Sequence, residues 1–157
     1  MEQGEVEMPE INLIDALDMA YPIIKHFEGL YLDAYTCPAG VWTIGYGHTK
    51  GVKKGQKITE EQANKMLEED ATEAARDALS VCPKLYERPK CFAAVISFVY
   101  NLGKTKFQGS SLAKKINEGD WDGASNEFPK WKLSGGKVLK GLVDRRAAEQ
   151  ELFKKGY

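Results

Sequence analysis

Apolar residues recur at helical spacing through most of the chain, with one early interruption. Between residues 12 and 27 they repeat every three or four positions, but Pro22 falls among them. Proline is tolerated in the first turn of a helix and is costly in its interior. We therefore expect one helix to end near Ala20 and a short one to run from Pro22 to Phe27, with Gly29 as its stop signal.

The pattern changes between residues 30 and 58, where β-branched and aromatic residues are concentrated. Residues 31–36 and 41–47 are predicted to pair as a hairpin. The segment 37–40 between them has Pro at its second position and Gly at its fourth, which suits a type I turn. A third short strand is expected near residues 57–58, so the predicted sheet is small.

Beyond this sheet the sequence predicts helices. Thr59 and Gln62 form a capping box at the start of a long helix that ends near Ser80. The helix from Phe92 to Leu102 is apolar nearly all round, which is typical of a central buried helix. The remaining expected elements are short helices over 110–118 and 120–127, a flexible loop at Gly135-Gly136 and a last amphipathic helix over 138–155.

Together these elements predict an α+β, mainly α fold in a single domain. Residues 1–11 are expected to form an acidic extension, and residues 12–157 the domain itself. Within the domain we expect a small lobe with the hairpin (12–58), a connecting helix (59–80) and a helical lobe (81–157). A chain of 157 residues can bury a sufficient core without disulfides or a metal.

Composition argues against several classes of protein, namely nucleic-acid binders, zinc proteins and proteins that insert into a membrane. The 22 Lys and Arg nearly balance the 23 Asp and Glu, which argues against a dedicated nucleic-acid binder. Three cysteines without a CxxC pair argue against a zinc site, and the sequence leaves open whether Cys82 and Cys91 bridge once the protein reaches an oxidising compartment. The first twenty residues contain no Lys or Arg, and no apolar run reaches about 18 residues. We expect neither a signal peptide nor membrane insertion. We expect the protein to be synthesised in the cytoplasm.

Candidate catalytic groups are concentrated around the hairpin. Glu28 stands immediately before it, Cys37 opens its turn and Thr43 lies on the returning strand. A hairpin can bring these three side chains together at one site. Taken singly, each has a plainer interpretation: a surface carboxylate at a helix end, an inert thiol and an ordinary strand residue.

The segment from Glu28 to Thr49 resembles the active-site segment of the phage-type lysozymes, the endolysin muramidases of glycoside hydrolase family 24. The motif of that family is Glu, eight residues, Asp or Cys, five residues, Thr, and Glu28, Cys37 and Thr43 meet both spacings. Two further segments match in order. Residues 98–103 resemble the buried helix of the second lobe, and residues 135–149 resemble the last long helix.

The resemblance implies a lysozyme-like fold and hydrolysis of the β-1,4 bond between N-acetylmuramic acid and N-acetylglucosamine in bacterial peptidoglycan. Glu28 would be the general acid, a role that needs a raised pKa. Cys37 stands where the family more often has a carboxylate that activates water, and Thr43 would help to hold that water. Activation of water by Cys37 would invert the anomeric configuration, whereas direct attack by its thiolate would retain it. We expect inversion. No cofactor and no metal are implied.

The resemblance also implies where the glycan binds. His48 would belong to the cleft wall, and Tyr100, Asn101 and Ser111 would line the cleft in the second lobe. Arg145 and Arg146 could approach Glu28 as counter-charges, but solvated helix arginines are the more common case and are expected here. Residues 130–157 carry eight Lys and Arg against three Asp and Glu, which would attract an anionic cell-wall polymer.

An endolysin of this kind is expected to act as a monomer on the cell wall, in the periplasm, after release through a separate pore, a holin. Three alternatives remain open at this point. They are a secreted antibacterial effector with the same domain, a non-catalytic peptidoglycan-binding protein of the same fold, and a thiol hydrolase that uses Cys37 and His48.

Overall fold

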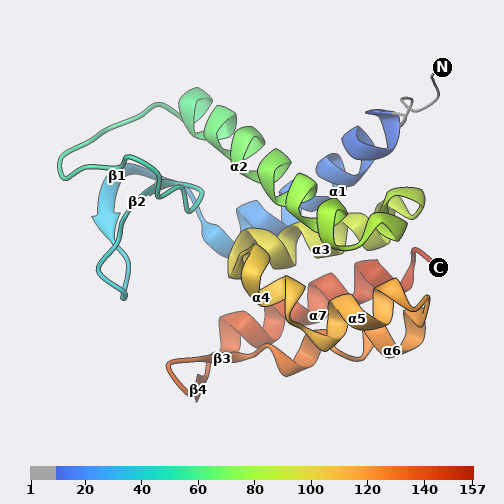
Figure 1. Ribbon diagram of the computed structural model, residues 1–157. Coiled ribbons are helices and arrows are strands. Elements are labelled where there is room, and N and C mark those ends of the chain that lie inside the picture. The colour runs from blue at the N-terminus through green and yellow to red at the C-terminus, as the bar shows by residue number, and fades with distance from the viewer. Residues whose placement is uncertain (1–9) are drawn as a thin grey trace.

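The fold was analysed in a computed structural model that describes residues 10–157. A small β-hairpin lobe and a larger helical body are joined by the long helix α2 (Figure 1). Most of the predicted acidic extension lies outside the described residues, and its last two residues belong to the first helix. No helix within residues 10–157 is long and apolar enough to cross a membrane.

Helix α1 spans Glu10–Glu28 without a break, so the predicted helix end near Ala20 was wrong. Pro22 lies in the interior of α1 and is exposed. The buried side chains of α1 occur on both sides of the proline, and the helix packs along α3. This shared packing outweighs the backbone hydrogen bond that proline cannot donate. The buried apolar residues of α1 are Ala16, Leu17, Ala20 and Ile24.

The hairpin is confirmed. Strand β1 (Tyr31–Thr36) pairs antiparallel with β2 (Trp42–Gly45), and the backbone N–H of Cys37 donates to Val41 O at 3.0 Å across the turn. The predicted third strand is reduced to an isolated bridge, in which Lys57 pairs with Asp33.

Helix α2 (Glu60–Val81) begins at the predicted capping box. The Thr59 hydroxyl accepts from Gln62 N at 3.1 Å, and Gln62 Oε1 accepts from Thr59 N at 2.9 Å. Its buried face consists of one leucine and several alanines, and such small side chains let it pack closely against α3. These residues are Ala63, Leu67, Ala71, Ala74, Ala75 and Ala78.

The central helix is also confirmed. Helix α3 (Pro89–Leu102) is buried at every position from Cys91 to Val99, and α1, α2 and α7 pack around it. It ends at Gly103, whose φ of +89° suits glycine. The arrangement as a whole is the predicted α+β, mainly α class.

Shorter elements complete the helical body. Residues Gly135 and Gly136, predicted as a flexible loop, form the two-residue turn of a second small hairpin, with φ values of +57° and +80°. Cys82 and Cys91 are free, and their thiols donate to two different backbone carbonyls. The elements are η2 (Pro83–Glu87), α4 (Lys104–Gln108), α5 (Ser111–Asn117), α6 (Trp121–Ser125), η3 (Phe128–Lys130), β3 (Leu133–Ser134), β4 (Lys137–Val138) and α7 (Lys140–Lys154).

Replacing Pro22 by alanine tests the continuity of α1. Alanine is favoured over proline in a helix interior by about 3 kcal/mol, and loss of the proline's restriction of the unfolded chain offsets roughly 1 kcal/mol. We expect Pro22→Ala to raise the free energy of unfolding in urea by about 2 kcal/mol. Pro129→Ala is the control, because Pro129 lies in the first turn of the short helix η3, where proline is well placed. A neutral or destabilising Pro22→Ala would contradict the continuous helix.

Candidate active site

Glu28 is the last residue of α1, at the point where the helical body meets the hairpin lobe. Its side chain is 21% exposed, and its Oε2 accepts a hydrogen bond from Arg145 Nη1 at 2.8 Å. On the hairpin side it lies directly against Gly47: a Cβ added there would come within 2.6 Å of Glu28 Oε1. Gly47 also has a φ of +80°, so both space and backbone conformation require glycine beside this carboxylate.

Arg145 is almost completely buried, with 4% of its side chain exposed, and the expectation of a solvated arginine was wrong. Besides Glu28, its guanidinium reaches the backbone carbonyl of Ser97 at 3.2 Å and Glu149 Oε2 at 3.4 Å. A buried guanidinium is retained only where such acceptors surround it. Arg145 therefore connects the end of α1 to the interior of the helical body.

Arg146 is buried as well, so its predicted exposure was also wrong. Its Nη2 donates to Glu149 Oε2 at 3.0 Å, and its Nε lies 2.7 Å from Glu149 Oε1 without hydrogen-bond geometry. Its guanidinium also lies over the ring of Phe98, 5.1 Å from the centroid. Burial lowers the pKa of Arg146, which Glu149 partly offsets.

Glu149 is the centre of this buried cluster. It is fully buried between the two guanidiniums, and the Ser97 hydroxyl donates to its Oε2 at 2.6 Å. Burial raises the pKa of Glu149, while the two arginines and Ser97 act in the opposite direction. Two carboxylates, Glu28 and Glu149, thus balance two guanidiniums. We call Ser97, Arg145, Arg146 and Glu149 the buried charge cluster.

Cys37 and Thr43 lie on the two sides of the hairpin turn. Cys37 is partly exposed, whereas Thr43 is buried and donates its hydroxyl hydrogen to Val41 O at 3.0 Å. Hydrogen bonds from the backbone of Val41 and Ala39, with a smaller contribution from Thr43, hold the pKa of the Cys37 thiol below its usual value. A thiol in this setting supplies more thiolate at neutral pH than a free cysteine does.

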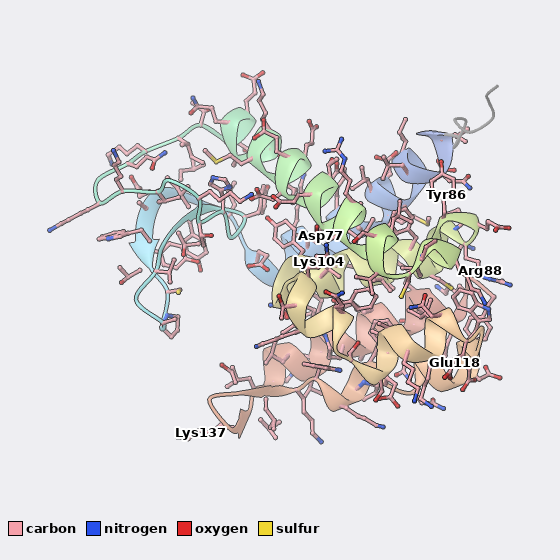
Figure 2. The ribbon with its side chains drawn as sticks, in the orientation of Figure 1. Asp77, Tyr86, Arg88, Lys104, Glu118 and Lys137 are labelled. Atoms are coloured by element: carbon pink, nitrogen blue, oxygen red, sulfur yellow. The ribbon has the colours of Figure 1, made fainter. Side chains whose placement is uncertain are left out.

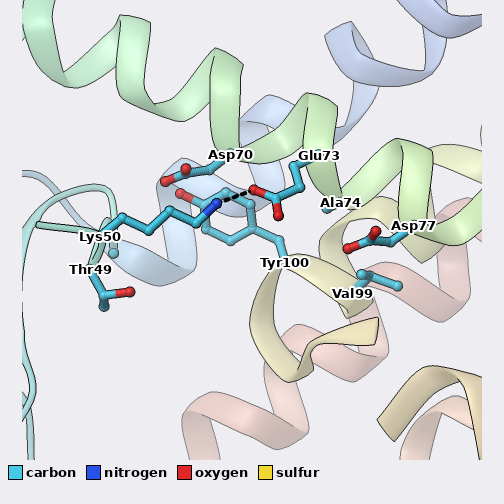
Figure 3. A pocket seen from close by; sticks show the side chains of 9 residues that line it. Thr49, Lys50, Asp70, Glu73, Ala74, Asp77, Val99 and Tyr100 are labelled. Carbon is cyan, nitrogen blue, oxygen red and sulfur yellow. Dashed lines mark hydrogen bonds and ion pairs between the residues drawn. The ribbon is translucent and has the colours of Figure 1, made fainter. Parts of the chain in front are cut away.

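His48 has both ring nitrogens engaged by the protein. Nδ1 lies 2.7 Å from Asp70 Oδ2 on α2, and Nε2 lies 3.0 Å from the carbonyl oxygen of Lys50. Lys50 in turn reaches across to Glu73 on α2 (Figure 3). Within the described residues, His48 therefore joins the hairpin lobe to α2 and presents no ring nitrogen to a ligand.

The predicted glycan-binding residues of the helical lobe are separated by the fold. Asn101 lines the same cavity as Glu28 and Arg145, with a volume of about 400 Å³, and its Oδ1 is buried without a partner among the described residues. Tyr100 faces the pocket beside Glu73, and its hydroxyl donates to Tyr46 O at 2.5 Å (Figure 3). Burial raises the pKa of Tyr100.

Ser111 lies in a further pocket, together with Lys106, Lys130 and Trp131. Of the predicted binding residues, only Asn101 therefore shares a cavity with Glu28. Sequence reasoning missed Glu149 and Ser97. A signal was present for Glu149, because it follows Arg145 by four residues and Arg146 by three, so that all three share one face of a helix. For Ser97, on a different helix, we find none.

Comparisons with known proteins bear directly on this cavity. A family model described as phage lysozyme matches residues 25–149, a range that contains every residue lining the cavity around Glu28. The endolysin of Acyrthosiphon pisum secondary endosymbiont phage 1 is 45% identical over 135 residues, covering 83% of this chain and 92% of the relative.

Two further similarities extend the comparison. The endolysin of Bacillus phage PZA is 45% identical over 137 residues, covering 85% of this chain but 53% of the relative, so the chain spans about half of that protein's length. The structure of the active form of P1 phage endolysin Lyz matches with a TM-score of 0.80 at 29% identity, covering 95% of this chain and 92% of that one.

The buried charge cluster is open to a stability test. We expect Glu149→Gln to lower the free energy of unfolding by about 3–5 kcal/mol, because it leaves two buried guanidiniums with one remaining carboxylate. Glu151→Gln, at an exposed position of the same helix, is the control and should change it by less than about 0.5 kcal/mol. Denaturation in guanidinium chloride at neutral pH measures both, and equal effects of the two substitutions would contradict the buried cluster.

Proposed function

The chain belongs to the phage lysozyme family, and on that premise we propose how it acts as an endolysin-type muramidase. It is a glycoside hydrolase that cleaves the β-1,4 bond between N-acetylmuramic acid and N-acetylglucosamine in bacterial peptidoglycan. The observation that carries the proposal is the partly exposed carboxylate of Glu28, held by Arg145 in a cavity at the end of α1. A carboxyl group in such a cavity can deliver a proton to a leaving glycosidic oxygen.

We propose that Glu28 is the general acid. This role requires Glu28 to deliver a proton as the bond breaks. The Arg145 guanidinium that contacts Glu28 is shared with Glu149. The same contacts fix the direction in which the carboxyl group points, since Arg145 is itself held by Ser97.

We propose that Cys37 is the base that activates the attacking water, with Thr43 beside it. The lowered pKa of Cys37 supports this role, because a larger fraction of the thiol is then ionised near neutral pH. Water activated in this way attacks the face of the sugar opposite to the leaving group, so the product has the inverted anomeric configuration. Neither step requires a metal ion or a cofactor.

We also propose that lysines around residues 130–140 guide the anionic cell-wall polymer toward the site. Lys140 lines the Glu28 cavity, Lys130 lines the neighbouring pocket, and Lys137 lies on the β3–β4 hairpin (Figure 2). Positive charge beside a cleft raises the encounter rate with polyanions. A monomeric state, action in the periplasm and release through a holin stay predictions.

Glu28→Gln tests the assignment of the acid. We expect it to slow lysis of outer-membrane-permeabilised cells, followed by turbidity, by at least about 100-fold, because glutamine cannot deliver the proton. Glu69→Gln, at an exposed position of α2, is the control and should lyse as the wild type does. A peptidoglycan-binding protein without activity would show no lysis in any form, and a thiol hydrolase would keep its activity in Glu28→Gln.

Substitutions of Cys37 test the base. Cys37→Ala should lose most of the activity, roughly 100-fold, whereas Cys37→Asp should keep much of it. In the wild type the active thiolate accumulates as the pH rises through the lowered pKa of Cys37. An aspartate, with an ordinary pKa of about 3.9, is already ionised at pH 5, so the rise in activity should move to lower pH.

These effects are measured by the rate of lysis at several pH values and by the anomeric configuration of the product. Normal lysis by Cys37→Ala, or identical pH profiles for the wild type and Cys37→Asp, would contradict a base at this position. Retention of configuration, detected by NMR of the first products, would instead favour direct attack by the Cys37 thiolate.

A further inference from the structure

Two tyrosines on β1 have rings in contact although they are four residues apart. The ring centroids of Tyr31 and Tyr35 are 4.4 Å apart at 42°. In a regular strand, residues four apart are separated by about 13 Å. Here Tyr31 lies opposite Gly45, whereas Tyr35 lies opposite Thr43, so four steps along β1 match two along β2. This bulge draws the two rings together.

The two tyrosines lie along the chain between Glu28 and Cys37, the two groups proposed to carry out the reaction. At one end, the Tyr31 ring lies 3.5 Å from the position that a Cβ on Gly29 would occupy, next to Glu28 along the chain. At the other end, Tyr35 is the cross-strand partner of Thr43 and stands two residues before Cys37. The two tyrosines therefore lie on the strand that joins Glu28 to Cys37.

The Tyr35 hydroxyl has no hydrogen-bond partner among residues 10–157, and it is not sealed from solvent. Two other phenols of the protein are hydrogen-bonded, since Tyr100 donates to the Tyr46 carbonyl and Tyr157 donates to Asp122. Burial raises the pKa of Tyr35, and so do Tyr31 and the charges of Glu28 and Cys37. The phenol therefore stays protonated at neutral pH and can donate.

We propose that Tyr35 is a further catalytic residue, whose hydroxyl donates a hydrogen bond to the sugar bound between Glu28 and Cys37. This inference rests on the proposed function, because the sugar is the expected occupant of that site. Sugar hydroxyl and acetamido oxygens supply the acceptors that the protein itself does not offer to this phenol. A tyrosine loses little conformational freedom on making such a contact.

Two substitutions that each remove a single oxygen test the inference. Tyr35→Phe and Tyr31→Phe are compared with the wild type and Glu28→Gln, by initial rates on purified peptidoglycan. We expect Tyr35→Phe to lower kcat/KM about 10-fold, the size of one lost hydrogen bond to the substrate. Tyr31→Phe is the matched control and should stay within about twofold of the wild type. Both variants should keep the wild-type melting temperature, because neither hydroxyl hydrogen-bonds to the described protein.

Binding gives a second readout. Introduced into Glu28→Gln, the Tyr35→Phe change should weaken sedimentation with insoluble peptidoglycan, and Tyr31→Phe should not. Wild-type rates in Tyr35→Phe, equal losses in both variants, or a lowered melting temperature in Tyr35→Phe would each overturn the inference. An active wild type with an unaffected Tyr35→Phe overturns this inference alone, whereas an inactive wild type overturns the proposed function with it.

Discussion

The contact between Arg145 and Glu28 joins residues 117 positions apart, and the rest of the site depends on it. A guanidinium buried to this extent must be surrounded by acceptors, or its desolvation would cost several kcal/mol. Its acceptors come from the end of α1, from Ser97 on α3 and from Glu149 on α7. The three helices must therefore be packed correctly before Glu28 has a defined orientation, so folding and preparation of the site are coupled.

The hairpin lobe meets this helical frame through a small number of polar contacts and one glycine. Gly47 approaches Glu28 where any side chain would clash, and Tyr100 on α3 holds the backbone at Tyr46. His48 reaches Asp70 on α2. These contacts hold the segment that follows β2 against the end of α1 and against α2. The proposed acid thus lies on the helical body and the proposed base on the hairpin.

Much of the fold could be predicted from the sequence, because local chemistry decides it. The capping box at Thr59 and Gln62, the turn between β1 and β2 and the apolar helix α3 follow from interactions between residues that are close along the chain. Of the motif residues Glu28, Cys37 and Thr43, Glu28 alone lines the cavity beside Arg145. Their catalytic roles remain proposals that await the substitutions described above.

Other features were decided by tertiary structure alone. Pro22 should end a helix in isolation, yet packing on both sides of it against α3 keeps α1 continuous. Arg145 and Arg146 would be solvated on a lone helix and are buried only because Glu28, Ser97 and Glu149 converge on them. The sequence by itself determined the first hairpin, the capped helix α2 and the apolar helix α3, and where the candidate side chains lie along the chain. The tertiary structure decided which of these groups meet, because the free energy of burying a charge depends on partners from distant parts of the chain.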